Sequence, residues 1–278
     1  MTDIACPLCG GTGLRCIEAT EPPYIVYACR ACDLGFVAPM PTREALSQAY
    51  DAAYYEPWSE QHVVARTHMW QRRVGLLQRE KGSGALLDVG GGDGAFIKAA
   101  VRAGFTVSAT EFSEAGAKAM RKKVPQAVVH VGELVELGLP EASFDIVTTW
   151  HSLEHMRDPF AAMAEIRRLL RPDGVAFIAV PNRNNYPMAL LYRLLKGRPY
   201  PLFSMQTREI HLFHFTPKSL QLALERAGLC VERIGWDHSM VEPAKRVIDM
   251  VAALPGIFGG PLMTEAMLAV VRPDGDAS

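Results

Sequence analysis

A glycine-rich stretch at residues 85–96 constrains this chain most. An apolar run that contains the carboxylate of Asp88 leads into glycines at alternate positions, and a helical pattern begins directly after them. This order is typical of a strand, a tight turn and a helix. Gly90, Gly92 and Gly94 permit positive φ angles and let the backbone approach a ligand closely. The stretch therefore predicts a bound nucleotide-like molecule.

Charge distinguishes between the ligands that such a turn can hold. Asp88 ends the strand and Asp93 lies among the glycines, so two carboxylates would face the pyrophosphate of a dinucleotide. S-adenosylmethionine (SAM) carries an ammonium and a sulfonium but no phosphate, and it fits better. Glu111 ends the next predicted strand, at residues 106–111, where a carboxylate can accept both ribose hydroxyls. Glu111 suits NAD equally, so NAD is the alternative ligand.

Three motifs resemble those of class I SAM-dependent methyltransferases. They are Asp88-x-Gly90-x-Gly92-x-Gly94, the pair Glu111-Phe112, and residues 150–155. The resemblance covers residues from about 40 to 272 and is greatest to the branch of ubiquinone-biosynthesis O-methyltransferases and bacterial glycan and natural-product methyltransferases. It implies a set of cofactor-binding residues in which Glu133 or the backbone of Leu134 meets the adenine amine: Asp88, Gly90, Gly92, Gly94, Glu111, Phe112, Glu133 and Leu134.

Strand and helix patterns alternate along the rest of the chain. With 278 residues, 49% of them hydrophobic, the chain can bury a full core. Strands are expected at 85–89, 106–111, 128–131, 144–149 and 175–180, and an antiparallel edge pair at 229–234 and 265–272. We expect an α/β fold with a Rossmann-like seven-stranded sheet, mostly parallel with an antiparallel last strand. Residues 85–278 form this core, and residues 182–215 form a lid or substrate wall inserted in it.

Two CxxC pairs near the N-terminus predict a metal site. Cys6 and Cys9 are separated from Cys29 and Cys32 by 19 residues, a spacing that matches tetrahedral Zn²⁺ in a zinc ribbon. Two disulfides and a rubredoxin-like iron site are the alternatives. A short ribbon buries little apolar surface, so zinc would supply much of its stability.

The segment between the ribbon and the core has its own pattern. We expect the ribbon at residues 1–40 and a helical linker and cap at 41–84, with a helix that begins after Thr42 and a long amphipathic helix from Val63 to Gly82. Tyr50, Tyr54, Tyr55 and Trp58 cluster between these helices. The resemblance implies that such aromatic rings help close the SAM pocket, and packing between ribbon and core is the equal alternative.

Histidines mark the candidate catalytic site. His151, Glu154 and His155 directly follow the predicted strand at 144–149, and open α/β sheets bind ligands at the carboxyl ends of their strands. His211 lies where the insertion returns to the core. If the methyl acceptor loses a proton, we expect His155, then His151, then His211 as the base.

Net charge limits the partners. Lys and Arg number 29 against 30 acidic residues, so no net basic field favours nucleic acid. We expect no membrane span, a cytoplasmic location and a small-molecule methyl acceptor, with the helix at 243–254 as a wall of the acceptor site or a homodimer contact. The alternatives are methylation of RNA or protein, an NAD-dependent oxidoreductase, and a zinc-ribbon binding module on a degenerate methyltransferase fold.

Overall fold

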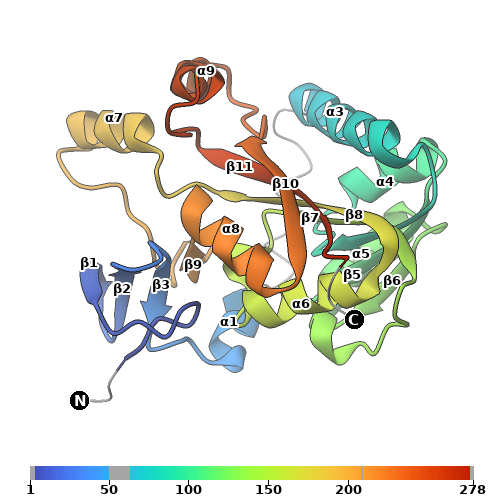
Figure 1. Cartoon of the computed structure of the whole chain (residues 1–278), viewed down its shortest axis with the longest axis horizontal. Coiled ribbons are helices and arrows are strands. Elements are labelled where there is room, and N and C mark those ends of the chain that lie inside the picture. The colour runs from blue at the N-terminus through green and yellow to red at the C-terminus, as the bar shows by residue number, and fades with distance from the viewer. Residues whose placement is uncertain (1–3, 50–62, 208, 276–278) are drawn as a thin grey trace.

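The computed structural model describes residues 4–49, 63–207 and 209–275 of the chain. In them a large sheet of seven strands lies beside a small sheet of four (Figure 1). The aromatic cluster predicted at residues 50–58 lies outside the described residues.

The large sheet confirms the predicted α/β fold. Its strand order is β10-β11-β8-β7-β4-β5-β6, and β11 is antiparallel to both neighbours while the other pairs are parallel. The order reverses between β4 and β7, which is where open α/β sheets bind ligands. The strands are β4 (Ala85–Val89), β5 (Thr106–Glu111), β6 (Val128–Val131), β7 (Phe144–Trp150), β8 (Leu170–Pro181), β10 (Leu229–Trp236) and β11 (Ala266–Pro273).

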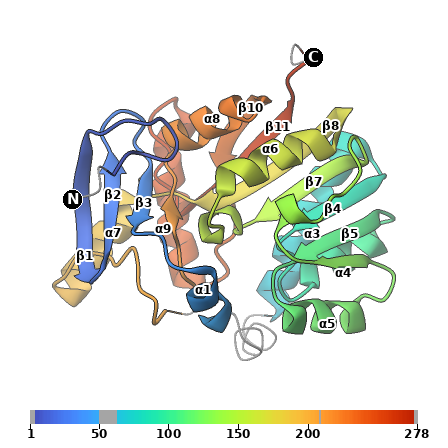
Figure 2. The ribbon, with the colours of Figure 1, turned by 90° about the horizontal axis from the view of Figure 1, so that it is seen from below.

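Helices cover both faces of this sheet (Figure 2). On one face lie α3 (Val63–Lys81), α4 (Ala95–Arg102) and α5 (Glu114–Lys123), and on the other lie α6 (Pro159–Leu169) and α8 (Pro217–Arg226). Because successive strand residues point to opposite faces, Leu86 packs in the hydrophobic cluster beneath α3 and α4, and Leu87 packs in the cluster beneath α6 and α8. Ser113, Asp158 and Thr216 cap α5, α6 and α8, and each side chain accepts a hydrogen bond from a backbone N–H in the first turn of its helix.

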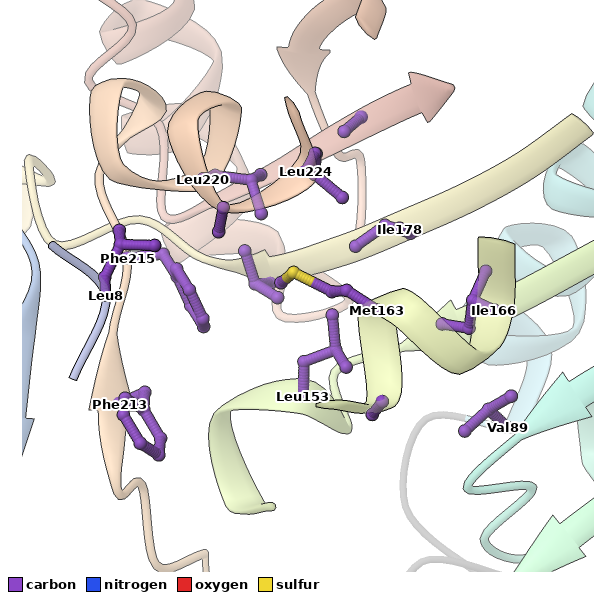
Figure 3. Close-up of a cluster of buried hydrophobic side chains, with 14 of the residues drawn as sticks. Leu8, Val89, Leu153, Met163, Ile166, Ile178, Phe213, Phe215, Leu220 and Leu224 are labelled. Atoms are coloured by element: carbon purple, nitrogen blue, oxygen red, sulfur yellow. The ribbon is translucent and has the colours of Figure 1, made fainter. Parts of the chain in front are cut away.

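The small sheet joins the N-terminal segment to the core. Three of its strands are β1 (Leu14–Glu21), β2 (Tyr24–Cys29) and β3 (Gly35–Ala38), and the fourth is β9 (Phe213–His214) from the end of the insertion. Gly35 pairs with His214 across β3 and β9. Figure 3 shows Leu8 of the N-terminal segment beside Phe215, within one hydrophobic cluster that extends to Met163 of α6. The N-terminal segment and the core thus share one hydrophobic core.

Three further helices and two short 3-10 helices complete the described structure. Helix α1 begins after Thr42, whose hydroxyl accepts from the N–H of Ala45 at 3.2 Å. Helices α7 and α9 lie along one edge of the molecule (Figure 1). The five elements are α1 (Arg43–Ala49), α7 (Tyr186–Lys196), α9 (Pro243–Ile257), η2 (Leu134–Glu136) and η3 (Leu153–His155).

Candidate functional site

Backbone N–H groups of the glycine turn after β4 donate hydrogen bonds to the last two residues of β5. Gly90 has φ 77°, and a Cβ there would lie 2.3 Å from the hydroxyl oxygen of Ser152. Its N–H donates to the carbonyl oxygen of Thr110 at 3.1 Å. Gly92 has φ 55°, and its N–H donates to Oε2 of Glu111 at 3.1 Å. The turn therefore requires glycine for conformation at both positions, and at Gly90 also for space.

Gly94 and Asp93 differ from their predicted roles. Gly94 has the expected positive φ, 70°, but it does not line the cavity. A Cβ at this position would lie 3.0 Å from Cγ of Met120, so this glycine serves the packing of α4 against α5. Asp93 pairs with Arg66 at 3.0 Å and with Lys123 at 3.4 Å. Since these cations compensate its charge, Asp93 gives little of the repulsion toward phosphate that the sequence suggested.

Asp88 and Glu111 line the cavity at the carboxyl ends of β4 and β5. Asp88 is buried, and its Oδ1 accepts from the hydroxyl of Thr148 at 2.7 Å. Burial raises the pKa of the Asp88 carboxyl to about 7, although the hydrogen bond from Thr148 opposes this. Glu111 also accepts from the N–H of Ser113 at 3.1 Å. Each of its oxygens can accept a further hydrogen bond, so Glu111 can still bind hydroxyl groups.

The adenine-side candidates lie around η2. Phe112, Glu133 and Leu134 all line the cavity. Arg43 of α1 stands 5.6 Å from the centre of the Phe112 ring and 3.5 Å from the Glu133 carboxylate. The Glu133 side chain is therefore shared with a cation, whereas the backbone of Leu134 begins a 3-10 helix at the cavity wall.

A buried ionic cluster fixes His151. His151 follows β7 with φ 56°, and its Nε2 lies 2.9 Å from Oδ2 of Asp237. Asp237 also accepts from Nη2 of Arg73 at 2.5 Å, and the Arg73 guanidinium lies 4.8 Å from the ring of Trp70 and 4.2 Å from that of Trp150.

The charges of this cluster set its protonation. Burial alone lowers the pKa of His151, but the hydrogen bond with Asp237 and the charges of Asp237 and Glu154 outweigh burial and raise it. Burial likewise opposes ionisation of Asp237, but the charge of Arg73 and the bond with His151 outweigh it and lower the pKa of Asp237 below its usual range. His151 is thus a histidine with increased basicity at the cavity wall.

A second group gathers around a buried carboxylate. Glu154 is 1% exposed, and neither carboxylate oxygen has a hydrogen-bond partner among the described residues. His155 Nε2 lies 3.9 Å from its Oε1, while His155 Nδ1 lies 2.8 Å from the carbonyl oxygen of Ile210. The His155 and His211 rings are 4.9 Å apart. Burial lowers the pKa of His211 well below its ordinary value, aided by the charges of His155 and His214. One ligand atom from each of Glu154, His155 and His211 lies within 4.8 Å of the others, so these three have the chemistry of a metal site as well as of a base.

All three candidate histidines and seven of the eight candidate cofactor residues line one cavity of about 1300 Å³. The insertion and the small sheet complete its wall, since Arg15 and Ile17 of β1 line it together with Leu202 and Phe203. The Glu18 carboxylate accepts from the N–H groups of Leu202 at 2.8 Å and Phe203 at 2.9 Å. The N-terminal sheet therefore holds the segment that follows α7 against the cavity.

The four cysteines of the CxxC pairs converge. Cys6 Sγ lies 3.5 Å from Cys32 Sγ, and Cys9 Sγ lies 3.5 Å from Cys29 Sγ. A disulfide needs about 2.05 Å between its sulfurs. Four thiolates at about 2.3 Å from a tetrahedral Zn²⁺ lie about 3.8 Å apart, so the arrangement fits a metal rather than two disulfides. Cys16 and Cys230 are exposed and lie outside this group.

Comparisons with known proteins agree with this geometry. A family model described as a methyltransferase domain matches residues 63–234. The chain belongs to this methyltransferase family. A probable SAM-dependent methyltransferase of Mycolicibacterium smegmatis is 31% identical over 63% of the chain and 60% of its own length. The ubiquinone biosynthesis O-methyltransferase of Bordetella avium is 31% identical over 65% of the chain and 77% of its own length.

Solved structures share the fold of this methyltransferase. The putative methyltransferase of Haloferax volcanii, solved in complex with the Trm112 methyltransferase activator, superposes with a TM-score of 0.57. The alignment covers 80% of the present chain and 96% of the other, at 18% sequence identity. At this sequence identity the likeness shows a shared fold.

Sequence reasoning missed Arg73 and Asp237 of the methyltransferase. A signal for each was present. Arg73 lies three residues after Trp70 and four before Leu77, on the stripe of α3 that faces the core, where an arginine needs a buried partner. Asp237 directly follows β10, which runs parallel to β8 because β11 is antiparallel to both. It therefore emerges at the same edge of the sheet as His151.

Proposed function

We propose that this protein transfers a methyl group from SAM to a hydroxyl or an activated carbon of a small molecule, such as a sugar or a natural-product or quinone-like intermediate. The observation that carries the proposal is the shared cavity, lined by the glycine turn and Glu111 and also by His151, His155 and His211. At about 1300 Å³ it exceeds the ~300–1000 Å³ of ordinary single-ligand pockets, so it has room for a donor and an acceptor.

The donor would occupy the wall built by β4 and β5. Asp88 and the turn at Gly90 and Gly92 would bind its amino-acid part, Glu111 its ribose hydroxyls, and Phe112 with Glu133 or the backbone of Leu134 its adenine. SAM supplies an electrophilic methyl group on a sulfonium. The chain's task is to hold the acceptor in line with that group and to exclude water.

A base is needed only where the acceptor loses a proton. His155 is the first candidate because the carbonyl oxygen of Ile210 fixes its ring, leaving Nε2 on the side of Glu154. His151 is the second because Asp237 increases its basicity. His211 is the third because its lowered pKa keeps it neutral but makes it a weak base.

Three features support a small acceptor. The relative from Bordetella avium is named for O-methylation in ubiquinone biosynthesis. The chain has a net charge of −1, and no Pro-Pro-Tyr motif of amino-methylating enzymes follows β7, where Trp150 is succeeded by His151.

Zinc is part of the proposal. Cys6, Cys9, Cys29 and Cys32 would hold one Zn²⁺ as thiolates, and the convergence of their sulfurs within 4.8 Å supports this. The role of residues 1–40 is then structural: a zinc ribbon that completes the acceptor wall next to the helical linker and cap at 41–84 and the core at 85–278.

The proposal is tested by transfer from labelled SAM to a panel of hydroxylated metabolites, with RNA and protein in parallel. We expect label only in a small molecule, and a His151→Ala, His155→Ala double variant that still binds acceptor but turns over at least about a hundred-fold more slowly. Transfer only to RNA or protein contradicts the acceptor class, and tight NADH binding without SAM binding contradicts the cofactor. Undiminished turnover of the double variant would leave His211 as the base to test.

A further inference from the structure

Helix α9 has its large apolar residues on the solvent side. Val247, Met250, Val251, Leu254, Ile257 and Phe258 recur at helical spacing and are all at least half exposed, and Phe258 is 86% exposed. The side that faces the protein carries small residues, Ala252 and Ala253, which are buried. A surface helix ordinarily has the reverse arrangement.

Polar contacts fix this orientation of α9. Asp249 is buried on the inner side, where its Oδ2 accepts from Nε1 of Trp236 at 2.6 Å and its Oδ1 accepts from the N–H of Glu265 at 2.6 Å. Rotation of the helix to bury the apolar stripe would break both hydrogen bonds and expose the two alanines. The outward stripe is therefore a stable feature of the fold.

Helix α7 continues the same surface. It contacts α9, and both lie along one edge of the molecule (Figure 1). None of its eleven residues is fully buried, and Leu194 and Leu195 are 74% and 72% exposed. We call the exposed apolar residues of these two helices the α7–α9 face. An apolar face of this extent marks an interaction site.

The positive charge next to the α7–α9 face indicates an anionic partner. Residues 184–207 contain Arg193, Lys196 and Arg198 but no acidic residue. The side chains of Lys196 and Arg198 are both exposed. A symmetric dimer through this face would bring the cations of one copy against the equally cationic surface of the other. Apolar side chains interleaved with cations instead match the interface of an anionic bilayer.

We propose that the α7–α9 face docks on the surface of an anionic lipid bilayer. None of the described helices is a candidate membrane span. The proposed contact is made at the bilayer surface by the exposed side chains of α7 and α9. Met188 and Leu190 of α7 also line the cavity, which places the cavity wall next to the docked face. The inference goes beyond the proposed function and does not depend on it.

Vesicle flotation of the full chain tests the proposal. We expect binding to phosphatidylcholine vesicles with about one-third phosphatidylglycerol, weak binding to phosphatidylcholine alone, and loss of binding at high salt. A Lys196→Glu, Arg198→Glu variant and a Leu194→Ser, Val251→Ser, Phe258→Ser variant should each bind at least about ten-fold more weakly. All five side chains lie outside the cavity wall, so calorimetry should show unchanged SAM affinity.

Val128→Ser and Lys122→Glu are matched controls, since Val128 is an exposed apolar residue of β6 and Lys122 an exposed cation of α5. They should bind vesicles as the unchanged protein does. Three results would overturn the proposal: no vesicle binding, equal binding to both kinds of vesicle, or equal loss in variants and controls. A dimer in sedimentation that the apolar variant dissociates would also overturn it, because a second copy would then cover the face.

Discussion

The Asp237 carboxylate and the His151 imidazole lie 2.9 Å apart, although 86 residues separate them in the chain. Each follows a strand of the large sheet, and the two strands end at the same edge. Arg73 of α3 donates a hydrogen bond to the same carboxylate oxygen. Asp237 therefore links helix α3 to the loops that follow β7 and β10 at the cavity wall.

Removal of this carboxylate charge should destabilise the protein. In Asp237→Asn the Arg73 guanidinium stays buried without an anionic partner, which costs about 3 kcal/mol of unfolding free energy. Urea denaturation followed by circular dichroism measures the loss. Asp173→Asn is the control. It breaks the ion pair between Lys81 and the exposed carboxylate of Asp173, and because exposed pairs contribute little to stability, the urea midpoint should stay unchanged. Equal midpoints for the Asp237 variant and the unchanged protein would contradict the role of the pair.

The same variant should change the pH dependence. With its raised pKa, His151 gives a stability contribution that is complete below about pH 6.5 and is lost as pH rises through the folded-state pKa. Asp237→Asn lowers that pKa, so the window of loss shifts to lower pH. If His151 is the base, the acid limb of the rate profile shifts in the same direction. NMR titration of the imidazole reads the pKa directly, and an unshifted titration would exclude the coupling.

Loss of either donor-site carboxylate should weaken SAM binding. Asp88→Ala and Glu111→Ala each leave ligand groups unpaired, at roughly 1.5–3 kcal/mol, which is about ten-fold or more in affinity. Titration calorimetry decides the matter. Glu114→Gln, an exposed carboxylate on α5 outside the cavity wall, should bind SAM normally. Unchanged affinity in either alanine variant would mean that the donor lies elsewhere.

Metal analysis of the purified protein should give one zinc per chain. Cys29→Ser should lose it, because three thiolates remain where the tetrahedral site needs four. Cys16→Ser removes an exposed thiol outside the group and should keep full zinc content. A coloured iron centre, or zinc retained in Cys29→Ser at the level of the control, would refute the assignment.

Loss of the link between the small sheet and the insertion should weaken binding of the acceptor but not of SAM. Glu18→Ala leaves the N–H groups of Leu202 and Phe203 without their carboxylate, so the segment after α7 loosens at the cavity wall. We expect KM for the acceptor to rise about ten-fold while the affinity for SAM stays constant. Glu225→Ala on α8 serves as the control. A parallel loss of SAM affinity would show that Glu18 supports the whole core instead.

Short-range patterns predicted most of the fold. Strands β4 and β5 have the expected bounds, residues 85–89 and 106–111, and helix α1 begins after Thr42 as expected, because caps, glycines and apolar patterns act within a few residues. Strand β1 was not predicted, since its sequence alternates weakly and its partners are β2 and the insertion that it supports.

The sequence by itself determined the α/β alternation, the glycine turn at residues 90–94, the carboxylates Asp88 and Glu111, and the cysteine set, because each depends on spacing along the chain. Tertiary structure decided the rest. It compensated Asp93 with Arg66 and Lys123, joined β9 to β3, and brought Asp237 and Arg73 to His151. Such contacts join residues far apart in the sequence, and their partners are set by which strand ends share an edge and which helix covers it.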